Sequence, residues 1–191
     1  KCLERRRFFK PRTQYGYSDF AFAILAAIAE AVTKVSFGTL FEQFVQNDLG
    51  LLNTTVKSDR QHRSPPATKG NRILPFWIWK ENNPYIAGGG MISNIEDMLR
   101  YIALQIESDK SYITSAHALC ENSALKNNNH LMCIGWHTYK HSNQLWHVGG
   151  VGTFRTSIIV NKKLQLGVAV LGNAKGRACA NAHYIAKMLY S

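Results

Sequence analysis

Apolar positions recur at three- and four-residue spacing in four parts of the chain, and this period predicts helices there. The first helix is expected after Tyr17, where Ser18 or Asp19 is a suitable N-cap. The third follows the sequence SNIE, in which Ser93 and Glu96 predict a capping box. The first two are expected to form a hairpin, and the last carries an apolar stripe suited to packing on a sheet. The expected ranges are residues 20–31, 37–47, 94–107 and 178–190.

Short runs typical of β-strands gather in the last third of the chain, at residues 131–139, 144–148, 154–160 and 164–171. Residues 57–85 are polar and interrupted by prolines, which predicts a long surface segment that either lines a cleft or merely connects two elements.

No internal repeat and no linker divides the chain, so we expect one domain of the α+β class over residues 1–191. A helical region over about 15–125 is expected beside an antiparallel sheet and final helix over about 131–191.

Composition narrows the classes of function. The 191 residues are 46% hydrophobic and carry a net charge of +11, but the basic clusters lack an aromatic RNA-binding pattern or a helix-turn-helix. Nucleic-acid binding is therefore less favoured than a solvated basic surface. The longest apolar run, residues 21–29, is too short for a transmembrane helix. Neither the four cysteines nor His137, His141 and His147 show metal-ligand spacing, so no metal or cofactor is predicted.

Two segments are candidates for chemistry. Residues 146–152, WHVGGVG, predict a strand with a titratable side chain followed by three glycines in four positions. Glycine weakens a strand, so close approach of a substrate backbone is one reason for it, with His147 as a cation or hydrogen-bond donor beside the reacting centre. The alternative is a glycine-rich turn with an ordinary half-buried histidine. Tyr17, at a helix start, offers a phenol that could relay protons, although a packing role is favoured when this position is considered alone.

Taken together and in order, these segments resemble a known family. Residues 9–19, FKPRTQYGYSD, resemble the Phe-x-Pro-Gly-Thr-x-x-x-Tyr-Ser-Asn stretch of class C β-lactamases, DD-peptidases and related esterases. Residues 147–156, HVGGVGTFRT, resemble their His-Thr-Gly-Gly-Thr-Gly-Gly-Phe-Arg-Ser motif. The Ala-Gly-Gly before a capped helix is matched from Ala87, and DLGL at 48–51 is similar to their Pro-Leu-Gly-Met helix exit.

The resemblance implies a serine acyl-enzyme mechanism on a β-lactam, a D-alanyl peptide or an ester, in a β-lactamase/transpeptidase-like fold. It implies that Tyr17 is the proton relay, that Asp19 takes the place of a substrate-facing Asn, and that His147 takes the Lys or His place. The third-motif strand would bind the acyl group and the N–H of Gly150 would be one oxyanion donor. The substrate-binding residues implied are Val148, Gly149, Gly150 and Arg155. A periplasmic or secreted location is usual for the family.

The chain departs from the family pattern at several positions. Asp19 replaces Asn, Arg12 replaces a turn glycine and Val148 replaces Thr or Ser. No Ser-x-x-Lys precedes Tyr17; the match at Ser123 follows Tyr17 in an Asn-rich context and is interpreted as accidental. Ser18 is interpreted as a helix cap rather than a nucleophile.

These departures predict an N-terminally truncated domain that is a poor catalyst alone and that pairs with the missing N-terminal segment or another chain. The alternative is a non-catalytic module that binds a peptidoglycan-like peptide or a partner.

Overall fold

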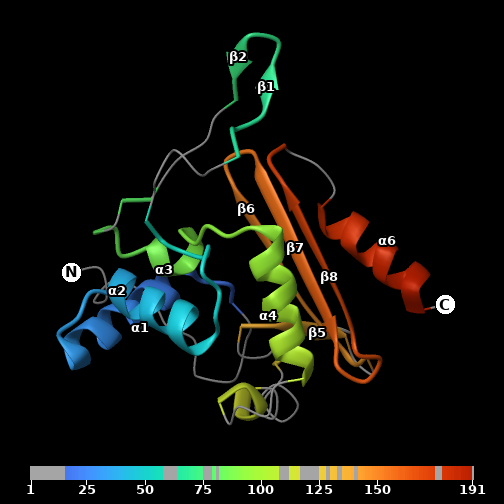
Figure 1. The fold of residues 1–191 in the computed structure, drawn as a ribbon, viewed down its shortest axis with the longest axis horizontal. Helices are drawn as coiled ribbons and strands as arrows, with labels where there is room; N and C mark the ends of the chain where they lie inside the picture. The colour runs from blue at the N-terminus through green and yellow to red at the C-terminus, as the bar shows by residue number, and fades with distance from the viewer. Residues whose placement is uncertain are drawn as a thin grey trace.

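Among the described residues, an antiparallel sheet of six strands, with helices on both faces, organises the fold (Figure 1). The computed structural model describes residues 16–57, 64–74, 79–80, 82–107, 112–116, 125–127, 130–132, 135–139, 142–174 and 178–190. This arrangement confirms the expected α+β class. In order across the sheet, the strands are β3 (Leu125–Asn127), β4 (His130–Met132), β5 (His137–Tyr139), β6 (Gln144–Val151), β7 (Phe154–Asn161) and β8 (Leu166–Gly172).

Each face of the sheet is covered by a different helix. Helix α6 (Ala178–Tyr190) packs on one face and α4 (Ile95–Glu107) on the other. A helical group lies beside the sheet on the α4 side (Figure 1). Its members are α1 (Asp19–Thr33), α2 (Phe37–Gln43), the π-helix η1 (Phe44–Asp48) and α3 (Ile86–Gly89).

The register explains how the strands form two cores, because successive side chains of a strand point to opposite faces. Trp146, Ile159 and Val168 are paired across β6, β7 and β8, and they pack with Ala182 and Ala186 of α6. The neighbouring residues on these strands point to the other face, where Leu145 and Val160 pack with Ile102 and Ile106 of α4.

Helix α4 packs closely on the sheet at Gly167. A Cβ built on Gly167 would lie 2.2 Å from Cγ2 of Ile102 and 3.1 Å from the carbonyl oxygen of Ile159. The missing side chain is therefore what permits this close approach.

The N-cap of α1 is the one predicted from the sequence, whereas that of α4 is not. The Ser18 hydroxyl accepts from the N–H of Ala21 at 3.1 Å, which confirms it as the N-cap of α1. The predicted cap of α4 at Ser93 is wrong: the Asn94 side chain accepts from the N–H of Asp97 at 2.9 Å. The Ser93 hydroxyl instead lies 2.9 Å from that of Thr54.

Strands occur in each of the four predicted runs, but their boundaries differ from those predicted. The run at 131–139 contains β4 and β5 rather than one strand, and Gly135 between them has φ +74°. Strand β6 runs three residues further than expected, to Val151. Asn127, expected in a link, lies in β3. The segment 57–85 contains a small hairpin of β1 (Thr68–Lys69) and β2 (Arg72–Ile73) that projects from the fold (Figure 1).

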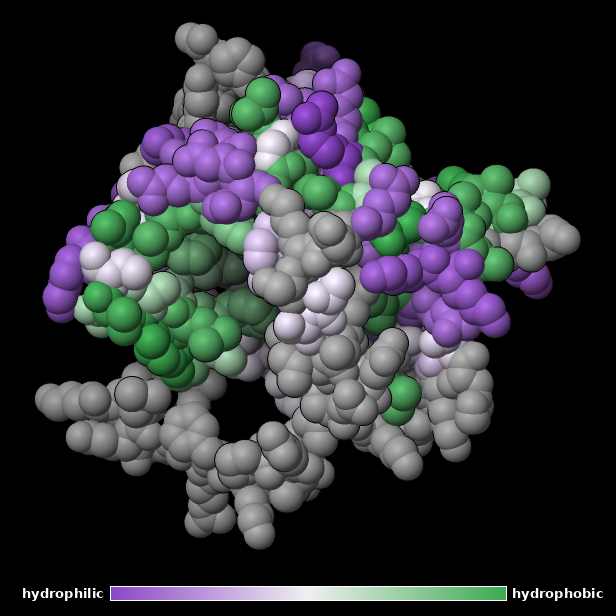
Figure 2. Space-filling model, turned by 60° about the horizontal axis from the view of Figure 1, so that its bottom comes forward, coloured by the Kyte–Doolittle hydropathy of each residue, from purple (hydrophilic) through white to green (hydrophobic). Residues whose placement is uncertain are grey.

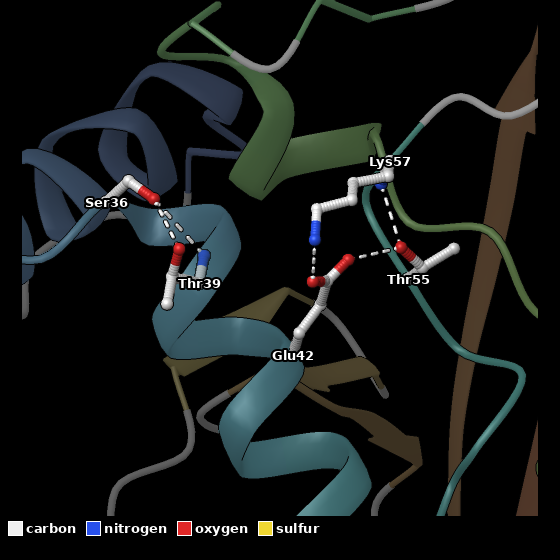
Figure 3. A network of polar contacts seen from close by, with 5 residues as sticks. All are labelled: Ser36, Thr39, Glu42, Thr55 and Lys57. Atoms are coloured by element: carbon white, nitrogen blue, oxygen red, sulfur yellow. Dashed lines mark hydrogen bonds and ion pairs between the residues drawn. The ribbon is translucent and has the colours of Figure 1, made fainter.

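Polar contacts tie the helical group to the loop that follows η1 (Figure 3). The Glu42 carboxylate of α2 accepts from the Thr55 hydroxyl at 2.6 Å and pairs with the Lys57 ammonium. Burial alone would raise the Glu42 pKa, but the hydrogen bonds from Lys57 and Thr55 and the Lys57 charge outweigh it, so the pKa is lowered. Thr55 also exchanges backbone hydrogen bonds with Ile92. This loop is therefore anchored on both sides.

Two helices leave apolar faces uncovered by the described residues. On α1, Phe22, Leu25, Ile28 and Val32 follow one stripe and are 45–77% exposed. Figure 2 shows apolar side chains gathered on the left of the molecule, the side on which Figure 1 places α1 and α2. The stripe predicted on α6 is buried only at Ala182 and Ala186, because Ile185 and Leu189 are exposed.

Among the described residues, no single helix is long and apolar enough to cross a membrane. Helix α1 and the segment Phe37–Asp48 would meet those criteria only as a pair, and they are bent by 86°.

Candidate functional site

Strand β6 presents an open edge over its second half. Strand β7 pairs with every residue of β6, whereas β5 pairs with it only where His137 faces Trp146. From His147 to Val151, β6 thus has a strand neighbour on one side only among the described residues. Gly149 and Gly150 on this stretch are exposed. An unpaired edge of this kind can add an extended peptide through main-chain hydrogen bonds.

The structure gives a second reason for these glycines. A Cβ on Gly149 would lie 2.6 Å from the Thr156 hydroxyl, and one on Gly150 would lie 3.2 Å from Nη1 of Arg155. Side chains of β7 therefore occupy the space that larger residues on β6 would need. From the sequence, the glycines were attributed either to an approaching substrate or to a glycine-rich turn, and crowding by β7 was not foreseen.

Arg155 holds the turn between β6 and β7. Its Nη1 donates to the carbonyl oxygens of Gly152 at 3.0 Å and Phe154 at 2.6 Å. Its implied role in binding substrate stays a prediction, and its contacts here are to the main chain of the turn.

Val148 lies opposite Ser157 across the strands. The Ser157 hydroxyl is buried and, among the described residues, has no hydrogen-bond partner. The Thr or Ser of the family motif would offer that hydroxyl a cross-strand partner, whereas valine cannot.

His147 faces the α4 side of the sheet. It pairs with Ile158, which packs in the cluster against α4, and its ring lies 5.2 Å from that of His137. Burial lowers the pKa of His147, and a hydrogen bond with the Val148 backbone opposes this only in part. The neutral imidazole is thus favoured near pH 7, which fits a hydrogen-bonding role better than a cationic one.

Helix α3 connects the two motif regions. A Cβ on Gly88 would lie 3.3 Å from Cβ of Asp19 at the start of α1, while one on Gly89 would lie 3.8 Å from Cγ2 of Val151 at the end of β6. The expected position of the glycine segment next to the first helix is therefore confirmed. Tyr17 is 59% exposed just before α1. That Tyr17 and His147 face one cleft stays a prediction.

Of the remaining candidates, the structure describes only Ser18. The Ser18 hydroxyl is occupied as the cap of α1, as interpreted from the sequence. Residues 9–15 of the first motif, Ser123 and His141 lie outside the described residues.

Sequence reasoning missed the position of Trp79. The sequence placed Trp79 only within the irregular segment 57–85, whereas Nε1 of its indole lies 3.7 Å from the position of a Cβ on Gly89. The available signal was weak: an aromatic residue in a segment that was considered as a cleft lining.

The pKa of His147 predicts how stability responds to acid. Since the folded chain disfavours the imidazolium, the unfolded chain binds more protons once the pH falls below the ordinary histidine pKa of about 6.5. The contribution of His147 is complete above that pH and is lost as the pH falls toward the lowered pKa. We expect Tm to fall more steeply from pH 7.5 to 5 for the wild type than for His147→Gln, measured by circular dichroism. Parallel curves would contradict this.

Comparison with known proteins identifies the fold. The family model for Beta-lactamase matches residues 3–189. Protein flp of Staphylococcus aureus (strain MW2) is 23% identical over 195 residues, which is 94% of this chain and 36% of that protein. Unguisins hydrolase ungD' of Aspergillus campestris is 25% identical, covering 88% of this chain and 35% of that protein. The chain thus spans about a third of the length of these relatives.

A solved structure from Pseudomonas syringae, described as a β-lactamase/D-alanine carboxypeptidase, superposes with a TM-score of 0.78 at 14% identity, over 95% of this chain and 61% of that one. The architecture of sheet and helices is therefore shared, and the family model spans nearly the whole sequence. The chain belongs to the β-lactamase family.

Proposed function

We propose that this chain supplies the substrate-binding strand and the proton-relay side of a serine hydrolase site. The site would act through an acyl-enzyme on a β-lactam, a D-alanyl peptide or an ester. The observation that carries the proposal is the open edge of β6, with His147 at one end and two exposed glycines beyond it. Two similar proteins support the class of reaction, since one is described as a β-lactamase/D-alanine carboxypeptidase and the other as a hydrolase.

In the proposed mechanism, an extended acyl group lies along β6. The N–H of Gly150 donates to the carbonyl oxygen as negative charge develops on it. Neutral His147 donates a hydrogen bond beside the reacting centre, and Tyr17 moves the proton between nucleophile and leaving group.

In this proposal, the nucleophile comes from outside the sequence given. No Ser-x-x-Lys precedes Tyr17, so the proposed activity requires that motif from a further segment or partner chain. The second candidate is a binding module that holds a peptidoglycan-like peptide without turnover. The carboxylate of Asp19, where the family has an amide, favours it because an ionised carboxylate cannot donate a hydrogen bond to a substrate carbonyl.

Covalent labelling separates the two functions. We expect no adduct between the chain alone and a fluorescent penicillin or a fluorophosphonate. We expect an adduct when a segment carrying Ser-x-x-Lys is co-expressed. His147→Ala should then slow labelling by about 100-fold or more, the usual contribution of a positioned catalytic side chain. The matched control is His183→Ala, because His183 lies on α6 across the sheet.

Three outcomes would overturn the proposal in different ways. Labelling of the isolated chain that is abolished by Ser123→Ala would show that Ser123 is the nucleophile, and loss with Ser18→Ala would assign that role to Ser18. Binding of a D-alanyl peptide without labelling in any combination would establish the non-catalytic module.

A further inference from the structure

Charge is distributed unevenly along the chain. All 12 acidic residues lie before residue 122, whereas eight of the 23 lysines and arginines follow it. The six-stranded sheet and α6 belong to this last part of the sequence, which has basic side chains and no acidic one. Such an asymmetry indicates contact with an anionic partner, either a nucleic acid or a lipid surface.

Three lysines of this part gather at one end of the sheet. Lys162 and Lys163 are exposed in the turn between β7 and β8. Lys187 is exposed in the last turn of α6, directly after Ala186. Ala186 packs with Ile159, two residues before β7 ends, so α6 brings Lys187 to the end of the sheet that carries the turn (Figure 1).

The described part of the chain leaves the charge of these lysines without a counter-ion. Among the described residues, Lys162, Lys163 and Lys187 form no ion pair with a carboxylate. The last acidic residue that the structure describes is Glu107, at the end of α4, which packs on the opposite face of the sheet from α6. The positive field at this end is therefore open to an external anion.

An exposed apolar side chain lies beside these charges. Leu164 directly follows Lys163 and is 52% exposed. Figure 2 shows hydrophilic side chains gathered on the right, the side on which Figure 1 places α6 and the β7–β8 turn. Basic side chains next to an aliphatic one suit an anionic bilayer, because headgroups attract the charges and the acyl boundary accepts the apolar group. A nucleic acid would match the charge alone and leave Leu164 in water.

We propose that this end of the sheet docks on a bilayer that contains anionic phospholipid. The docking residues, called the lysine surface below, are Lys162, Lys163, Leu164 and Lys187.

The lysine surface is separate from the proposed catalytic site, and the inference does not depend on that function. Gln144, the first residue of β6, pairs with Asn161 next to the turn. Gly150 lies six residues further along β6, which corresponds to about 20 Å at roughly 3.3 Å per residue. Docking through the lysine surface would therefore leave the open edge of β6 outside the contact with lipid.

Sedimentation with sucrose-loaded vesicles tests the proposal on the chain as it is. The vesicles contain phosphatidylcholine alone or phosphatidylcholine with phosphatidylglycerol. We expect the chain to bind the phosphatidylglycerol vesicles about tenfold more tightly or better. Raising the salt from about 0.1 M to about 1 M should remove most of this preference, because the Debye length falls from about 10 Å to about 3 Å.

Variants separate the charge from the apolar group. Lys162→Gln with Lys163→Gln should weaken binding to phosphatidylglycerol vesicles about 30-fold, since each basic side chain near the bilayer contributes roughly 1 kcal/mol. Leu164→Ser should weaken it about tenfold, because the apolar side chain no longer enters the acyl boundary. All three side chains are exposed, so Tm measured by circular dichroism should stay at the wild-type value.

The β1–β2 hairpin supplies the matched control. Lys69→Gln with Arg72→Gln also removes two exposed positive charges. The hairpin lies at the other end of the sheet, because Asn173, just after β8, accepts from the N–H of Ala67 and donates to the carbonyl oxygen of Pro65. This double variant should weaken vesicle binding less than about threefold, since its charges lie well beyond a Debye length from the lysine surface.

Three results would overturn the proposal. Equal weakening by the two double variants would show that net charge, and not the lysine surface, attracts the chain to lipid. Equal binding to vesicles with and without phosphatidylglycerol would exclude an anionic headgroup as the ligand. Binding of a fluorescent oligonucleotide but of neither kind of vesicle, with loss of that binding in the Lys162→Gln, Lys163→Gln variant, would assign the surface to nucleic acid instead.

Discussion

Gly167→Ala is expected to lower the free energy of unfolding by about 3 kcal/mol, the upper part of the usual range for adding a methyl group to a packed core. The added Cβ would lie 2.2 Å from Cγ2 of Ile102 and 3.1 Å from the Ile159 carbonyl oxygen. One obstacle is a buried, branched side chain and the other is backbone. Neither can move freely, so α4 would have to shift away from the sheet. Urea denaturation followed by circular dichroism measures the loss.

Gly172→Ala is the matched control, because it lies on the same strand and its Cβ would meet nothing closer than the Arg155 carbonyl oxygen at 3.5 Å. It should be neutral or slightly stabilising, since alanine restricts the unfolded chain. Ile102→Ala should couple favourably with Gly167→Ala: the double variant should lose less stability than the sum of the two single losses. Equal stability of the Gly167 and Gly172 variants would mean that α4 does not approach the sheet this closely.

The uncovered apolar faces of α1 and α6 predict that the isolated chain self-associates. Exposed apolar patches and unpaired strand edges promote association or aggregation, and β8 has a strand neighbour on one side only in the part of the chain that the structure describes. We expect Leu25→Gln combined with Ile28→Gln to shift the chain toward monomer in light scattering without lowering Tm, because both side chains are more than half exposed. Ala27→Gln with Ala31→Gln, also exposed on α1, is the control and should leave association unchanged.

A segment that carries Ser-x-x-Lys is expected to stabilise the folded chain. If the segment binds the folded chain but not the unfolded chain, and is present about 100-fold above its Kd, it should raise the free energy of unfolding by about 2.7 kcal/mol. For a domain of this size that corresponds to a rise of roughly 5–10 °C in Tm. A sharply melting monomer whose Tm does not respond to the segment would show that the apolar faces have no such partner.

Local pattern was sufficient to predict most elements, because apolar spacing encodes which face of each helix or strand is buried. Errors arose where a distant contact decided between two local solutions. Ser93 and Asn94 both satisfy the rule for an N-cap, and the hydroxyl of Ser93 is engaged by Thr54, far away in sequence. The apolar spacing predicted for α6 was correct, but which of its apolar side chains are buried depends on the elements that pack against the helix.

The candidate site was predictable in its motifs and less so in its geometry. The glycines after His147 can be read from the sequence, but the crowding of Gly149 by Thr156 depends on the register between β6 and β7. The proximity of Trp79 to Val151 results from an irregular segment for which no periodicity exists. Such contacts are set by tertiary packing and have no local signal.

The bridge made by Gly88 and Gly89 has a consequence for how this site can evolve. Because these residues have no side chains, α3 can lie close to Asp19 at the start of α1 and to the side chain of Val151 at the end of β6. Substitutions of other side chains around the site can therefore alter what the site accepts while this spacing is kept. A methyl group added at Gly88 would lie 3.3 Å from Cβ of Asp19. It would change the distance between α3 and α1 without changing the chemistry of the residues that line the site.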